Sequence, residues 1–190
     1  MENSSYLKRL FKHLHTINSH KKEVMRLCFK CGLIKQGLKH DMSKYTPIEF
    51  LSGVKYYQGY RSPISKEREV KGYSLGWLHH AGKNKHHFEY WVDKDYKNLN
   101  YYVIKMPLNY LIEGTLDKIA ASKTYNKENY TNSSPLEFLV NGKDQYLMGQ
   151  ENYRRFKDLL TYLSENGEEK ALIYYKELYH KWKKDNSFDI

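Results

Sequence analysis

Apolar residues recur every three, four or seven positions along most of the chain, which is the spacing of one face of an α-helix. In the first thirty residues, one such stripe consists of Leu10, His13, Ile17, His20, Val24, Leu27, Cys28 and Cys31. Gly32 is a typical end for this helix. Because His20 lies on the apolar stripe, we expect its side chain to face the core.

Turn and capping residues divide the next part of the chain into shorter helices. One helix is expected from residue 33 to about residue 43. Thr46, Pro47 and Glu49 fit the cap, first position and capping box of another helix that ends near residue 60. Residues 66–80 predict a fourth helix, and residues 84–91 either continue it or form a separate turn. Residues 93–106 are the least helical, and 101–104 fit a short strand or an extended connection.

The second half of the chain also favours helices. Pro107 begins one whose apolar face is Leu108, Leu111, Ile112, Thr115 and Ile119. Another begins at Ser134-Pro135, and two more fit 151–165 and 168–184, separated at Asn166-Gly167. We therefore predict an all-α protein of seven or eight helices. Residues 1–125 would form a helical core, and residues 126–190 an extension packed on it within one domain.

The composition agrees with a globular protein. The chain has 190 residues, of which 40% are hydrophobic and 28% charged, and this excludes disordered and collagen-like classes. No apolar run approaches the ~20 residues of a membrane span, and the first residues lack the apolar core of a secretory signal. Two cysteines cannot build a disulfide framework. We therefore expect a cytoplasmic protein without a membrane partner.

The charge balance favours anionic partners. Lys and Arg number 32 against 22 Asp and Glu, which gives a net charge of +10. Such a surface attracts nucleotides, nucleic acids or acidic surfaces without choosing among them. The 19 tyrosines offer rings that are suited to half-buried positions and to stacking on bases.

Histidines and aspartates occur in an order that points to metal binding. Along the chain the set is His20, His40-Asp41, His79-His80, His86-His87 and Asp117. Imidazole and carboxylate groups are ligands of divalent transition metals. Neighbouring residues on a helix point about 100° apart. His40 and Asp41 can therefore hold one ion or a pair of ions only if other helices supply further ligands.

Each of these residues has a structural interpretation when it is taken alone. His20 could be a hydrogen-bonded core histidine, Asp41 a helix cap, and Asp117 an ion-pair partner of a nearby lysine. The histidine pairs could be polar surface residues. Cys28 and Cys31 have metal-ligand spacing, but no second pair completes a site, so a role in core packing is favoured. Only the order and spacing of the whole set favour a metal centre.

The order H…HD…H…H…D on helices resembles the HD superfamily of metal-dependent phosphohydrolases, over the range from His20 to Asp117. The segment HDMSK at residues 40–44 is similar to the HD-x-x-K element of that superfamily. The string WLHHAGKNKHHFEYW at 77–91, together with that element, resembles a small family of uncharacterised bacterial and phage proteins placed near the HD hydrolases. The close spacing of the histidine pairs and the lack of a Gly-Tyr-Pro signature argue against a standard cyclic-dinucleotide enzyme.

The resemblance implies roles for individual residues. The metal ligands would be His20, His40, Asp41, His80, His87 and Asp117, holding one or two ions of Mn, Fe, Co, Ni or Zn. Asp41 and Lys44 would be catalytic, and the substrate would contact Lys44, His79, Asn84, His86 and Lys118. The spacing leaves open which member of each histidine pair is a ligand.

The activity implied by the resemblance is hydrolysis of a nucleotide or a related phosphate ester or diester by a metal-activated water. Two alternatives stay open. One is an oxygenase in which the same ligands hold two irons, and the other is a module that binds nucleotides or nucleic acid without catalysis. We expect an anionic small molecule, in the first instance a nucleotide, as the ligand. A nucleic-acid partner and a homo-oligomer are left open.

Overall fold

The computed structural model describes residues 2–142 and 147–185, and this part of the chain is predominantly helical, as predicted. It contains eight α-helices: α1 (Glu2–Lys30), α2 (Ile34–Lys39), α3 (Pro47–Tyr56), α4 (Pro63–Lys71), α5 (Leu75–Lys83), α6 (Leu108–Asn126), α7 (Ser134–Asn141) and α8 (Gln150–Lys184). Three short 3₁₀-helices connect them: η1 (Met42–Tyr45), η2 (Phe88–Trp91) and η3 (Lys127–Asn129). None of the described helices combines the length and the apolar character that crossing a bilayer requires.

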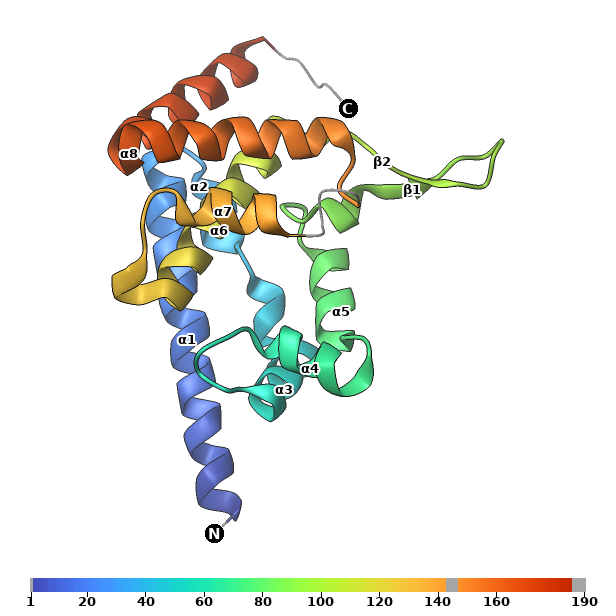
Figure 1. The fold of residues 1–190 in the computed structure, drawn as a ribbon, viewed down its shortest axis with the longest axis vertical. Helices are drawn as coiled ribbons and strands as arrows, with labels where there is room; N and C mark the ends of the chain where they lie inside the picture. The colour runs from blue at the N-terminus through green and yellow to red at the C-terminus, as the bar shows by residue number, and fades with distance from the viewer. Residues whose placement is uncertain (1, 143–146, 186–190) are drawn as a thin grey trace.

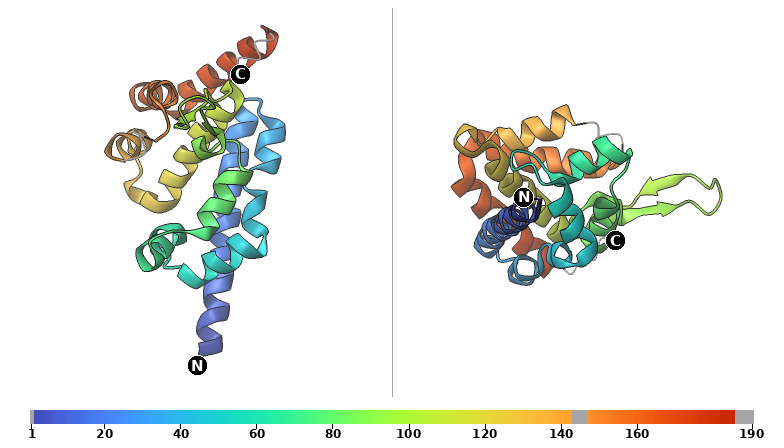
Figure 2. Two further views of the ribbon diagram at one scale, coloured as in Figure 1. Left: turned by 90° about the vertical axis from the view of Figure 1, so that its right-hand side faces the viewer. Right: turned by 90° about the horizontal axis from the view of Figure 1, so that it is seen from below.

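Helix α1 is long and runs vertically in Figure 1, and α2, α3, α6 and α8 pack against it. Its C-terminal half contacts α2, α6 and α8, and its first turns extend beyond the rest of the molecule. Two strands, β1 (Val92–Lys94) and β2 (Tyr101–Val103), pair in antiparallel register and form a hairpin that projects from the helices (Figure 2). The least helical stretch of the sequence therefore forms a hairpin.

The main apolar core lies between α1, α6 and α8. Val24, Leu116 and Leu160 are among its fully buried members, one from each helix. Helices that follow residue 125 therefore bury their apolar faces against those that precede it. Cys28 and Cys31 are free thiols buried in this core, as the packing interpretation predicted. Burial raises the pKa of Cys31 to about 12.

The predicted helix over residues 33–43 is wrong in its second half, because the chain leaves helical geometry at His40-Asp41. Helix α2 ends at Lys39, and Asp41 has φ 55° and ψ 24°, in the left-handed region. The capping box expected at Thr46 is also absent. The Thr46 hydroxyl donates to the carbonyl of Ser43 (2.6 Å), and the carboxylate of Glu49 has other partners, described below.

The predicted fourth helix is in fact two helices, α4 and α5. Gly72, with φ 81°, ends α4, and the Ser74 hydroxyl accepts from the Trp77 amide (3.0 Å) at the start of α5. The break predicted at Asn166-Gly167 is confirmed, since Gly167 has φ 81° and ψ 164° inside α8. The two halves of α8 then fold back on each other, and the Tyr175 hydroxyl donates to the Leu159 carbonyl across the bend (2.5 Å).

Four charged side chains join α1, α6 and α8 beside this bend. Arg26 donates to Glu23 (2.7 Å) and Glu168 (2.8 Å), and Lys123 pairs with the same two carboxylates. The hydrogen bonds from Arg26 and Lys123 outweigh the effect of burial and lower the pKa of Glu23 to about 2. The pKa of Glu168 is also lowered, because the two cations outweigh the effect of burial there too.

Glu168→Gln is expected to lower the free energy of unfolding by about 1 kcal/mol at neutral pH, because it removes a shared acceptor from a partly exposed network. The folded-state pKa of Glu168 lies below its ordinary value of 4.5. The stabilisation is therefore present above that value and is lost as the pH falls through the folded-state pKa. Urea titrations should show wild type and variant converging in acid. Glu151→Gln, whose partner Arg154 is 63% exposed, is the control and should leave the stability almost unchanged.

Candidate metal centre

Four segments that are far apart in the sequence bring imidazole and carboxylate groups together between α1, α5 and α6. Helix α1 contributes His20, the junction of α2 and η1 contributes His40 and Asp41, the end of α5 and the turn after it contribute His80, His86 and His87, and α6 contributes Asp117. Among the described residues, these side chains form two groups with ligand atoms close enough to hold a metal ion, and both groups include Asp41.

The first group consists of His20, His40, Asp41 and Asp117, with ligand atoms within 4.8 Å of one another. Oδ1 of Asp117 lies 2.9 Å from Nε2 of His20 and 3.4 Å from Nε2 of His40. Oδ2 of Asp41 lies 3.4 Å from the same His40 nitrogen. Two imidazoles and two carboxylates thus surround one point.

The second group consists of Asp41, His80, His86 and His87. Its carboxylate atom is the other oxygen of Asp41: Oδ1 lies 3.4 Å from Nε2 of His80 and 3.5 Å from Nε2 of His86. The two oxygens of Asp41 therefore face different groups of imidazoles. This is the arrangement of a carboxylate that can bridge two neighbouring ions.

The backbone at Asp41 explains how neighbouring side chains reach the same site. On a continuous helix, the side chains of His40 and Asp41 would diverge. The left-handed conformation of Asp41, which aspartate tolerates better than most residues, turns its carboxylate inward instead. Both side chains are almost completely buried.

Two further carboxylates orient the imidazoles from behind. Oε1 of Glu113 lies 2.9 Å from Nδ1 of His40 and 3.2 Å from Nδ1 of His86. Oε2 of Glu49 lies 2.8 Å from Nδ1 of His80. A carboxylate can only accept, so each of these Nδ1 atoms carries a proton, and in the neutral imidazole the Nε2 lone pair faces the site.

The donor set fits a cation because several of its inward atoms have no hydrogen-bond partner. Nε2 of His40, His86 and His87 and Oδ1 of Asp41 are buried without one in the described chain, and Oδ2 of Asp41 has only the Lys44 ammonium nearby. Buried polar atoms without partners are rare, because each loses its hydration without compensation. A metal ion in each group would satisfy them. The buried cluster can therefore hold a metal ion.

The electrostatics also favour bound cations. Burial disfavours a charge on His40, but Asp41, Asp117 and Glu113 outweigh that effect and raise its pKa well above the ordinary value. Burial likewise opposes ionisation of Asp41, but His40 and Lys44 hold its pKa well below the usual range. The buried carboxylates thus stay ionised and need positive charge nearby.

Lys44 supplies one such charge at the edge of the cluster. Its Nζ lies 2.6 Å from Oδ2 of Asp41, and its side chain is 27% exposed. Burial lowers its pKa, but Asp41 and then Asp117 outweigh this and raise it. The ammonium therefore stays charged and lies close to the first group, on a side chain that is partly exposed. His13 lies near it and is neutral, since burial and then Lys44 lower its pKa to about 4.

All six ligands implied by the resemblance lie in the two groups, and His86 joins them. His86 was expected to contact substrate, yet its Nδ1 is held by Glu113 and its Nε2 is directed to Asp41. His87 also belongs to the second group, with its ring against Trp77 at a centroid distance of 4.7 Å. His80 and His87 do not share a helical face, because α5 ends at Lys83.

Three residues expected to contact substrate lie elsewhere. Nδ1 of His79 lies 2.6 Å from Glu49 and is outside both groups. The buried Asn84 amide donates to the His80 carbonyl (2.8 Å) and to the Ser43 hydroxyl (2.8 Å), beside the second group but not in it. The Lys118 ammonium lies over the Phe156 ring, 5.0 Å from its centroid, and therefore faces α8. A helix carries adjacent residues to different sides, so Lys118 cannot follow Asp117 into the cluster.

Two glutamates at the cluster, Glu113 and Glu49, were not predicted as part of the site. Glu113 stands in an apolar run and lies four residues before Asp117, on the same side of α6. A charged residue in such a run is almost never buried unless it is paired, and this was the available signal. Glu49 was assigned to a capping box by its spacing from Thr46, and no local signal distinguishes that role from its contacts with α5.

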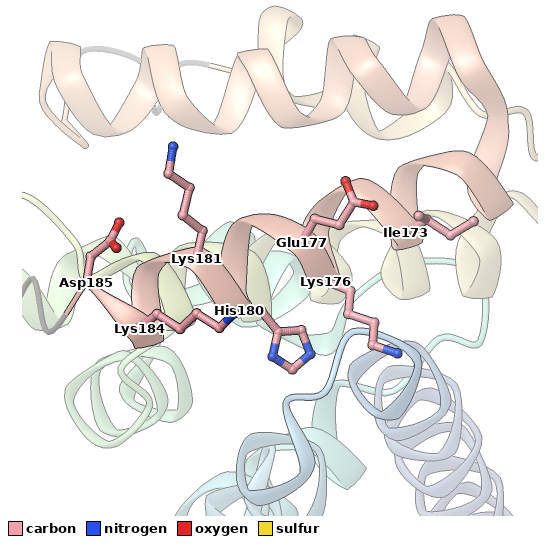
Figure 3. Close-up of a pocket in the computed structure, with 7 residues that line it drawn as sticks. All are labelled: Ile173, Lys176, Glu177, His180, Lys181, Lys184 and Asp185. Atoms are coloured by element: carbon pink, nitrogen blue, oxygen red, sulfur yellow. The ribbon is translucent and has the colours of Figure 1, made fainter.

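A hollow of about 550 Å³ lies on the surface along the second half of α8 (Figure 3). It is lined by Ile173, Lys176, Glu177, His180, Lys181, Lys184 and Asp185. Lys176 and His180 point to one side of the helix, and Glu177 and Lys181 to the other. All these residues come from α8 and its C-cap, and none belongs to the two metal groups, so the candidate site is the buried cluster.

A family model matches most of the chain. It describes a family of unknown function, DUF5662, and covers residues 9–162, which include every member of both metal groups. The chain therefore belongs to this family. No curated protein and no solved structure matches it.

Proposed function

We propose that this member of the DUF5662 family is a metal-dependent phosphohydrolase with two ions at its centre. The observation that carries the proposal is that the two carboxylate oxygens of Asp41 face different groups. Its Oδ2 faces His40, and its Oδ1 faces His80 and His86. A single ion would leave the buried atoms of the other group unpartnered. Two ions would satisfy the inward atoms of both.

The two groups assign the ligands. The first ion would be held by His20, His40, Asp41 and Asp117, and the second by Asp41, His80, His86 and His87. Imidazole-rich ligation favours Mn, Fe, Co, Ni or Zn over Mg. The order of these residues along the chain also supports the proposal, because it resembles that of the HD superfamily.

Ions bound there would polarise phosphate oxygens and make a water acidic enough to attack phosphorus near neutral pH. The protein's own residues complete the site. Asp41 and Asp117 place negative charge among the imidazoles. Glu49 and Glu113 accept the Nδ1 protons of the imidazoles, on the side away from the ions. Lys44 is partly exposed and can donate to a phosphate oxygen or to the leaving oxygen.

The proposed substrate is an anionic phosphate ester, in the first instance a nucleotide. The net charge of +10 would speed the capture of an anion. Lys44 is the cation closest to the cluster and offers a phosphate a charge-assisted hydrogen bond. An oxygenase with two irons would use the same ligands, so metal content has to be measured together with activity.

Elemental analysis of the purified full-length protein tests the proposal. We expect two transition-metal ions per chain, removable by a chelator. Hydrolysis of bis(4-nitrophenyl) phosphate and of nucleotides should be lost with the ions and restored by Mn²⁺ or Co²⁺. Two irons with oxygen consumption but no hydrolysis would establish the oxygenase instead. A folded protein that binds no transition metal would contradict both.

A further inference from the structure

The geometry points to Glu113 as a positioning residue shared by the two ion sites, which would make both sites depend on a single carboxylate oxygen. The inference rests on the proposed function in one respect, since it requires two ions. It goes further because it identifies the residue that orients imidazole ligands of both ions. Glu113 is not a ligand in either of the groups that contain Asp41, and it acts through the imidazoles.

The contacts of Glu113 carry the inference. Its Oε1 accepts from Nδ1 of His40 at 2.9 Å and lies 3.2 Å from Nδ1 of His86. His40 belongs to the first group and His86 to the second. The two rings lie against each other with centroids 4.4 Å apart, and Glu113 is only 5% exposed. One buried oxygen thus fixes the tautomer and the orientation of one imidazole in each site.

Helix α6 is built to hold this arrangement. Glu113 precedes Asp117 by one turn, so the shared oxygen and a ligand of the first group come from the same side of the helix. Gly114 lets the backbone of His86 approach. A Cβ at this position would lie 2.6 Å from the His86 carbonyl oxygen, closer than real Cβ contacts allow. Helix α6 therefore positions His86 through both its backbone and its ring.

Glu49 provides a matched comparison. It is also buried and also accepts from two imidazoles, those of His79 (2.6 Å) and His80 (2.8 Å). His79 lies outside both groups, so Glu49 supports an imidazole of the second site only. Two glutamates with similar surroundings should therefore have different effects on the two ions.

Calorimetric titration of the metal-free full-length variants with Co²⁺ tests the inference. Glu113→Gln is expected to weaken both ions by about 10- to 100-fold, the usual effect of losing an outer partner of a metal-bound histidine. Glu49→Gln should weaken one ion by a similar factor and leave the other unchanged. The absorption bands of bound Co²⁺ should change for both sites in the first variant and for one in the second.

Further variants separate positioning from general disruption. Gly114→Ala displaces His86 and should weaken only the second site, although it alters the same helix. If Glu113→Gln does not fold, Glu113→Asp keeps the charge but withdraws the oxygen, and it should again weaken both ions.

The outcomes distinguish this inference from the proposed function. Wild type that binds fewer than two ions would overturn both. Wild type with two ions, together with a Glu113 variant that weakens one ion or neither, would overturn the inference alone. The same holds if one ion is lost completely and the other keeps its wild-type affinity. Glu113, His40 and His86 are also close enough to hold an ion themselves. An ion found between these three residues would make Glu113 a ligand and would overturn its role as a positioning residue.

Discussion

Asp41→Asn should abolish the binding of both ions at micromolar metal and reduce phosphate ester hydrolysis by a factor on the order of 10³ or more. The two oxygens of Asp41 face the two groups, so one substitution removes the negative charge that both groups share. Asparagine has nearly the same shape and tolerates the left-handed backbone at this position. The loss would therefore come from the missing charge and from the amide hydrogens that face a cation, with the fold retained.

Elemental analysis and thermal unfolding with and without Mn²⁺ measure this effect. The melting temperature of wild type should rise when the ion is added, because ligands that bind only the folded state stabilise it. The melting temperature of the variant should not change. Asp158→Asn on α8 is the control, because its side chain is 62% exposed and distant from the cluster, and it should behave as wild type. If the Asp41 variant still held two ions, the carboxylate would not be the bridge.

Lys44→Gln should lower kcat by about 10²-fold, the usual effect of losing one donor to a charge that develops in the transition state. The same variant should bind metal more tightly than wild type, since the ammonium 2.6 Å from Asp41 competes with a cation for that oxygen. A loss of activity with a gain in metal affinity is difficult to explain by misfolding.

Steady-state kinetics and metal titration of the same preparations test this pair of effects. Lys39→Gln, an exposed lysine at the end of α2, should change neither quantity. Lys44→Arg keeps the charge and should retain part of the activity. If the glutamine variant lost metal and activity together, Lys44 would have a structural role.

Periodicity predicted the long helices because their apolar stripes are the faces buried in the core. The stripe that contains Val24 and Leu27 packs against α6 and α8, and Gly167 bends α8 where the sequence placed a break. The end of α2 could not be predicted in this way. Nothing local requires Asp41 to leave the helix, and its conformation follows from contacts with side chains that lie much later in the chain.

The candidate site was predictable as a set and not in its details. The order of histidines and aspartates singled out the segments that the fold brings together. The place of His86 in the second group could not be predicted, because Glu113, which holds its Nδ1, is more than twenty residues away in the sequence. That contact depends on how α6 packs against the turn after α5.

The two buried thiols allow opening of the core to be measured by their chemical reactivity. Cys28 and Cys31 are free and inaccessible, and the Cys31 thiol donates to the Leu172 carbonyl of α8 (3.6 Å). Burial keeps them protonated, so they do not compete for metal, although Cys28 lies on the same helix as His20. A thiol-specific reagent can reach them only when the packing of α1 against its neighbours opens. The rate of alkylation therefore measures opening of the core directly, without any added label.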